Sequence, residues 1–295
     1  MFIITQFIGI YVVSYYSPVK IVAGEKINVS APSLPFGLEP PQPQTASDYT
    51  GFFSSIVIAF IIAVVLLFML TKFKWEIILK IWFFVVIVLA LSLALIAIFS
   101  IKIALIAVII ALPLAALKFY GKSFIIHNLT ELLIYPGIAA VFVPLLNVWT
   151  VIALLILISI YDIWAVWHSG IMQKMAKYQI NTLKVFSGFF VPYVSKQVKS
   201  KIRFWKKTLS KSQLNKKRIK VNVAILGGGD IVFPIITAGV MLKTLGLMSA
   251  IFVIIGATLG LAYLFFAAEK KKFYPAMPFI TAGILVGILA SFLIL

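Results

Sequence analysis

Cysteine is absent from this 295-residue chain, and histidine and acidic residues are scarce, with two and eight respectively. The missing cysteines exclude disulfides, thiolate chemistry and zinc–thiolate sites. Two histidines, His127 and His168, are too few for a histidine-based metal site, so we expect neither a metal nor another cofactor. Only 12% of the residues are charged and 63% are hydrophobic, whereas soluble domains are about 45–50% apolar. With a mean hydropathy of +1.13, the chain reads as an integral membrane protein.

Long apolar runs predict an all-α, polytopic membrane protein with nine transmembrane helices, because each run is near the roughly 20 residues needed to cross a bilayer. The predicted spans are 2–16, 52–71, 77–100, 101–117, 131–148, 150–168, 221–242, 246–267 and 275–295. The first run lacks a basic segment before it, so we expect a retained span rather than a signal peptide. Three regions follow: an N-terminal membrane portion (1–168, spans one to six), a basic loop (169–220) and a C-terminal membrane portion (221–295, spans seven to nine).

Basic residues predict the orientation of these spans. The formal charge of +18 is better explained by the positive-inside rule than by a nucleic-acid partner, and we expect none. With the N-terminus inside, 21 of the 26 Lys and Arg residues fall on the cytoplasmic side. The N-terminus and the 169–220 loop are therefore predicted to be cytoplasmic and the C-terminus to lie outside.

The 169–220 loop carries 14 basic residues and no acid, a composition that favours anionic lipid headgroups. Its apolar segment 185–194 (VFSGFFVPYV) is predicted to lie in the membrane interface or to re-enter it. The loop is then either a lipid-bound linker or a segment that gates access to a site.

Among the eight acids, six have structural explanations from the sequence. Glu131, for example, follows Asn128 by three residues and resembles a capping box at the start of the fifth span. Asp162 and Asp230 have no such explanation. They lie in the sixth and seventh spans, roughly 8 and 10 Å from the cytoplasmic face at 1.5 Å per residue. Intramembrane carboxylates are costly and usually functional, and matched depth on consecutive antiparallel spans predicts a pair.

Two carboxylates held close together cannot both ionise easily, so they share a proton. The ionised one can take a proton from water while the protonated one donates to a carbonyl oxygen. That is the chemistry of an aspartic protease, in which water attacks the peptide carbonyl directly.

Two further motifs accompany the pair. Gly227, Gly228 and Gly229 directly precede Asp230, and small residues let helix backbones approach closely in lipid. Pro275 and Pro278 enclose Ala276 and Met277 at the start of the ninth span, where prolines leave backbone groups unpaired. Irregular backbone of this kind could pair with an extended substrate segment.

Together, Tyr161-Asp162, Gly227-Gly228-Gly229-Asp230 and Pro275-Ala276-Met277 resemble the motifs of the presenilin and signal peptide peptidase family of intramembrane aspartyl proteases. That family has YD on the sixth span, GxGD on the seventh and PAL on the ninth. The order, the span numbers and the long loop between the sixth and seventh spans agree. Met277 departs from the pattern, since it stands where the family has Leu, a residue of similar volume.

The resemblance implies a presenilin-like nine-helix fold and an intramembrane endopeptidase with Asp162 and Asp230 as the catalytic dyad. The residues implied to contact substrate are Tyr161, Gly227, Gly228, Gly229, Pro275, Ala276 and Met277. Implied partners are transmembrane-helix protein substrates and the surrounding bilayer, while accessory subunits and a homo-oligomer stay open. The predicted orientation favours the presenilin branch, because signal peptide peptidases are inverted.

A second class of function uses the same acids. Paired intramembrane carboxylates also carry protons or cations in transporters, whose sites often lie at broken helices. Such folds often consist of two related halves, and this sequence shows no convincing second copy of the Gly-Gly-Gly-Asp segment.

Overall fold

The computed structural model describes residues 1–22, 25–28, 43, 45–72, 75–121, 123–168, 178, 186–193, 222–267 and 274–294. These residues form nine α-helices of 15 or more residues and four short strands. The helices are α1 (Phe2–Tyr16), α2 (Ala46–Lys72), α3 (Glu76–Phe99), α4 (Ala104–Tyr120), α5 (Phe124–Phe142), α6 (Val148–Ile163), α10 (Gly229–Leu245), α11 (Leu247–Ala267) and α12 (Met277–Ile294).

Six helices within the described residues are long and apolar enough to cross a membrane, at Ala46–Leu66, Glu76–Phe99, Phe124–Leu145, Val148–His168, Leu247–Ala267 and Met277–Ile294. Helices α1, α4 and α10 have 15, 17 and 17 residues. At 1.5 Å per residue they fall short of a hydrocarbon core about 30 Å thick. The chain is thus multi-pass, and membrane crossing by these three helices stays a prediction.

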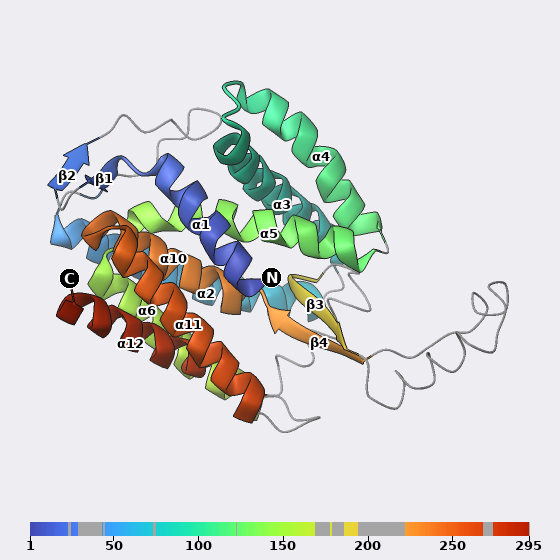
Figure 1. The fold of residues 1–295 in the computed structure, drawn as a ribbon. Coiled ribbons are helices and arrows are strands. Elements are labelled where there is room, and N and C mark those ends of the chain that lie inside the picture. The colour runs from blue at the N-terminus through green and yellow to red at the C-terminus, as the bar shows by residue number, and fades with distance from the viewer. Residues whose placement is uncertain are drawn as a thin grey trace, which may run out of the picture.

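Helix α10 lies in the middle of the bundle, where it packs against α1, α5, α6, α11 and α12 (Figure 1). Its side chains are buried on several faces; Ile231, Ile235 and Met241, for example, are inaccessible to solvent. Helices α3 and α4 form a second group that packs on α5. The first turn of α10 therefore contains buried residues, Asp230 and Ile231.

Two short antiparallel hairpins depart from the all-α expectation. Strands β1 (Val19–Val22) and β2 (Glu25–Asn28) pair in the predicted outer loop. Strands β3 (Gly188–Tyr193) and β4 (Asn222–Gly227) pair with Gly188 opposite Gly227. Residues 188–193 of the 185–194 segment, which was predicted to lie in the interface or to re-enter it, thus form a strand. The rest of the basic loop lies mostly outside the described residues. The predicted contacts of this loop with lipid headgroups therefore lie outside them as well.

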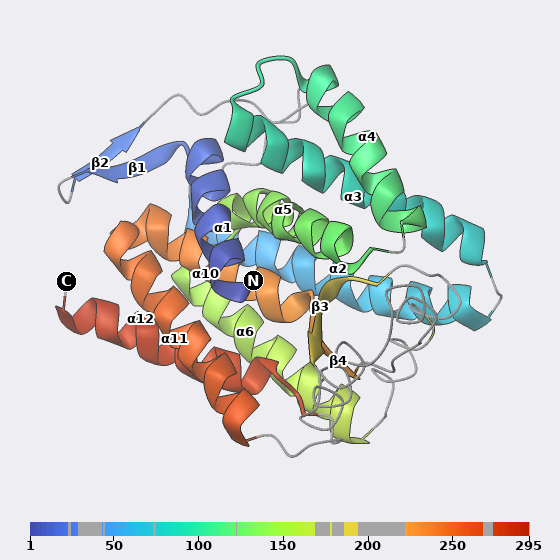
Figure 2. The same cartoon turned by 45° about the vertical axis from the view of Figure 1, so that its right-hand side comes forward.

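The two hairpins lie at opposite ends of the bundle. Figures 1 and 2 show β1, β2 and the C-terminus at one end, and β3, β4 and the N-terminus at the other. Helix α10 contacts β4 and β1. Segments predicted to face the outside and segments predicted to face the cytoplasm are therefore separated in space.

Two helix starts differ from the sequence prediction. The seventh span does not begin as a helix at 221, because strand β4 occupies Asn222–Gly227 and α10 begins at Gly229. The fifth helix begins at Phe124. The predicted capping box of Asn128 and Glu131 is therefore wrong, since both residues lie inside α5 and are buried.

Candidate active site

Asp162 lies near the C-terminal end of α6, a helix that starts with a capping box between Asn147 and Thr150 and continues after Ile163 into a π-helical turn, Trp164–His168. Its side chain is buried, with a relative exposure of 6%. The backbone N–H of Met277 donates a hydrogen bond to Oδ2 of Asp162, with N···O 3.0 Å. The Ala276 backbone lies within hydrogen-bonding reach of the same carboxyl group.

Asp230 lies in the first turn of α10 and is also buried, with a relative exposure of 7%. A helix N-terminus favours negative charge. The Gly227 backbone, at the end of β4, lies within hydrogen-bonding reach of the Asp230 carboxyl group. The structure thus holds Asp230 at a strand-to-helix junction, where sequence reasoning had placed it about two helical turns into a span.

The two aspartates lie on helices that pack against each other, α6 and α10, and the carboxyl groups are close enough for their charges to act on one another. The structure thus places one buried aspartate near the end of α6 and another at the start of the adjacent α10. That the two act as a pair stays a prediction.

The glycines before Asp230 meet different surroundings. A Cβ at Gly227 would lie 3.1 Å from Oδ2 of Asp230, and one at Gly228 would lie 2.7 Å from Oγ of Ser187. A Cβ at Gly229 would meet only Phe233, at 3.5 Å, which is an ordinary contact. Gly227 thus leaves the space that the carboxyl group occupies.

Pro275, Ala276 and Met277 form the turn that leads into α12, and Pro275 and Met277 are buried. Tyr161 is half-buried, with its ring 5.3 Å from that of Phe60 in a perpendicular arrangement. The motif residues of all three segments thus lie around the ends of α6, α10 and α12.

Sequence reasoning missed two buried polar contacts near the site. Ser159 Oγ donates to Thr281 Oγ1 at 2.8 Å, joining α6 to α12. Gln6 Nε2 donates to the carbonyl of Ile231 at 3.1 Å, joining α1 to the start of α10. A lone glutamine in the apolar run 2–16 was the available signal for the second contact.

The family model described as "Signal-peptide peptidase, presenilin aspartyl protease" matches residues 19–295. The chain belongs to this family of aspartyl proteases. Two solved structures share its fold, both of a presenilin family intramembrane aspartate protease, one in space group C222 and one in P2. The first aligns with a TM-score of 0.59, 16% identity and coverage of 100% of this chain and 96% of the other. The second aligns with a TM-score of 0.58, 17% identity and coverage of 100% and 95%. A comparison with curated proteins gave no significant match.

Proposed function

We propose that this family member is an intramembrane aspartyl endopeptidase that hydrolyses peptide bonds within transmembrane helices of other proteins, with Asp162 and Asp230 as its dyad. The observation that supports the proposal is the burial of both aspartates on packed helices, Asp162 near the end of α6 and Asp230 at the start of α10, where the charge of Asp162 acts on Asp230. The family assignment supports the same chemistry and does not favour the transporter alternative.

In the proposed reaction the dyad shares one proton. The ionised carboxylate removes a proton from water as the water oxygen attacks the peptide carbonyl carbon. The protonated carboxyl group gives its proton to the carbonyl oxygen, and a tetrahedral diol forms without a covalent enzyme intermediate. Collapse of the diol breaks the C–N bond and protonates the departing amine, which returns the dyad to its starting state.

The substrate segment must be extended at the moment of attack, because a helix hides its amides in internal hydrogen bonds. Strand β4 leads directly to Asp230, and within the described residues its one strand partner is β3. We expect an unwound substrate to add along the other edge of β4, beside the Pro275–Met277 turn.

Orientation and partners complete the proposal. The N-terminus and the 169–220 loop face the cytoplasm and the C-terminus faces outside, in keeping with the distribution of basic residues. The loop contacts anionic headgroups, and any accessory subunit or second copy would dock on the outer helices.

The test uses purified protein in detergent with a single-span peptide labelled at both ends. We expect fragments from the wild type and none from Asp162→Asn or Asp230→Asn, while both variants keep the wild-type unfolding temperature. A transition-state analogue with a hydroxyl in place of the scissile carbonyl should block cleavage. Activity retained by either variant would show that Asp162 and Asp230 are not a catalytic dyad. Ion flux in liposomes without proteolysis would favour a transporter.

A further inference from the structure

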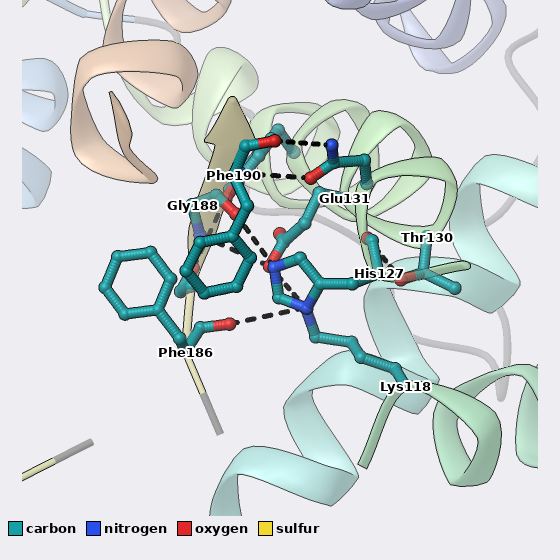
Figure 3. A network of polar contacts seen from close by, with 10 residues as sticks. Lys118, His127, Thr130, Glu131, Phe186, Gly188 and Phe190 are labelled. Carbon is teal, nitrogen blue, oxygen red and sulfur yellow. Dashed lines mark hydrogen bonds and ion pairs between the residues drawn. The ribbon is translucent and has the colours of Figure 1, made fainter. Parts of the chain in front are cut away.

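Side chains of α5 bind one edge of β3 (Figure 3). We call it the outer edge, because β4 pairs along the other. Phe190 N–H donates to Oδ1 of Asn128 at 3.1 Å, and Nδ2 of Asn128 donates to the Phe190 carbonyl at 2.9 Å. Gly188 N–H donates to Oε1 of Glu131 at 3.3 Å, and Nε2 of His127 lies 2.9 Å from the Gly188 carbonyl. All four backbone groups of these two residues are thus satisfied by one helix.

The α5 side chains take the place that a third strand would occupy beside β3. Residues of an antiparallel strand alternate between positions that bond to the partner and positions whose N–H and C=O point the other way. Gly188 and Phe190 are two apart and occupy the second kind of position. The next residue of that kind, Pro192, has no N–H to satisfy. The outer edge of β3 is therefore closed at Gly188 and Phe190. Within the described residues no strand pairs with the far side of β4, which we call its open edge.

A buried ion pair completes the contacts. Nζ of Lys118, on α4, pairs with Oε1 of Glu131, and the two side chains have relative exposures of 2% and 1%. Lys118 Nζ also lies 3.5 Å from the Phe186 carbonyl, just before β3. A buried ion pair is a poor source of stability, since desolvation opposes the attraction between the charges. A cavity of about 110 Å³ borders Lys118, Glu131 and Phe186, so apolar packing does not fill this side of the hairpin.

The path from these contacts to the active site is short. Gly188, held by Glu131, lies opposite Gly227 in the register of β3 and β4. The Gly227 backbone in turn reaches the carboxyl group of Asp230. A displacement of β3 would therefore move the residue that contacts the Asp230 carboxyl group.

We propose that Lys118, His127, Asn128 and Glu131 form a polar clamp that positions the β3–β4 hairpin and, through it, Asp230 and the open edge of β4. The clamp residues are positioning residues, which act through the hairpin. Their effect on catalysis rests on the proposed proteolytic function, whereas their effect on the hairpin does not.

The first experiment measures the hairpin and the activity separately in Asn128→Leu, a variant of similar shape that loses both hydrogen bonds to Phe190. Thr130→Val is the matched control, because Thr130 is equally buried in α5 but bonds only to the carbonyl of His127 in its own helix. We expect hydrogen exchange in peptides covering 186–193 to be about tenfold faster in Asn128→Leu than in the wild type, as for the loss of two hydrogen bonds. In Asn128→Leu, hydrogen exchange in peptides from α3 and α11 should stay as in the wild type. In Thr130→Val, exchange in the 186–193 peptides should also match the wild type.

Activity should follow exchange. We expect kcat to fall about tenfold in Asn128→Leu and less than twofold in Thr130→Val. Unchanged exchange in Asn128→Leu would overturn the clamp, as would faster exchange with unchanged kcat. If the wild type cleaves no peptide, the proposed function fails while the exchange result still decides whether the clamp holds the hairpin.

A second experiment tests whether Glu131 acts as the acceptor for the Gly188 N–H or only as the negative partner of Lys118. The neutral pair Lys118→Met with Glu131→Gln keeps an oxygen that can accept the Gly188 N–H. The reversed pair Lys118→Glu with Glu131→Lys restores the charges but puts no acceptor at that position. We expect the neutral pair to keep kcat within about threefold and the reversed pair to lose at least tenfold. Equal activity of the two pairs would overturn the role of Glu131, and a reversed pair that does not fold leaves Asn128→Leu to decide.

Discussion

The backbone N–H of Met277 donates to Oδ2 of Asp162 at 3.0 Å, across 115 residues of sequence. Met277 is the first residue of α12, a position whose N–H has no acceptor within its own helix. The next residue, Pro278, has no N–H at all. The irregular start of α12 thus supplies a free donor, which an uninterrupted helix through 275–278 would have used internally.

Replacing Met277 by proline should remove this donor selectively, because proline is tolerated at the first position of a helix. A charge-assisted hydrogen bond contributes about 1.5–3 kcal/mol, so we expect kcat to fall about 10- to 100-fold. Met277→Ala controls for the lost side chain, and Met277→Leu keeps both the N–H and the volume. Steady-state cleavage of the labelled peptide measures all three. If proline and alanine variants lose activity equally, the N–H has no role of its own.

Gly227 and Gly229 should differ in their tolerance of alanine. A methyl group at 227 would lie 3.1 Å from Oδ2 of Asp230 and would displace that carboxyl group, while one at 229 makes an ordinary 3.5 Å contact with Phe233. We expect Gly227→Ala to lower kcat about tenfold, because a reacting carboxyl group must give way by a few tenths of an ångström and catalysis is sensitive to small misplacements of reacting groups. Gly229→Ala should stay within about threefold. Equal losses in the two variants would mean that the carboxyl group is not confined by the missing side chain at 227.

Much of the fold was predictable because hydrophobic runs report membrane helices directly. The burial of Asp162 and Asp230 was predictable as well, since both acids stand in apolar runs where an acid has few structural roles. The hairpin was not. The strand sequences FFVPY (189–193) and NVAIL (222–226) are mostly apolar and do not alternate with polar residues. A short apolar run of this kind does not distinguish a strand from a helix.

Contacts between distant segments were also beyond the sequence. Lys118 directly follows the predicted span 101–117, and Glu131 was assigned to a helix cap, so neither position indicated a buried ion pair. Only the fold shows that the two side chains meet and are buried together. The Met277 N–H was equally hidden, because its acceptor lies in another helix.

Ser159 and Thr281 should be energetically coupled. Their hydroxyl groups are hydrogen-bonded at 2.8 Å between α6 and α12, three residues before Asp162 and four after Met277. Interhelical hydrogen bonds in membrane proteins contribute about 0.6 kcal/mol on average. We therefore expect a double-mutant cycle of Ser159→Ala and Thr281→Val to give a coupling of about 0.5–1.5 kcal/mol in the free energy of unfolding in detergent. Strict additivity would show that this contact does not hold the helices together.

Gly283 should be intolerant of even one methyl group. Helices α11 and α12 approach each other through Gly256 and Gly260 on one and Gly283 and Gly287 on the other, a small-xxx-small pattern on both. A Cβ at 283 would lie 2.1 Å from the carbonyl oxygen of Gly256, a backbone atom that cannot rotate away. The helices must therefore separate, and overpacking of this kind costs about 1–3 kcal/mol.

Separation of α12 from α11 would also displace Met277 at its start, so Gly283→Ala should lower kcat as well as the free energy of unfolding. The matched control is Gly51→Ala on α2, where a Cβ would meet nothing within 4 Å. Because alanine is the better helix former by about 1 kcal/mol, that control should unfold no more easily than the wild type. Unfolding curves and cleavage rates of the two variants in one detergent make the comparison. A Gly283→Ala protein as stable and active as Gly51→Ala would show that the close approach of α11 and α12 is not needed to place the donor to Asp162.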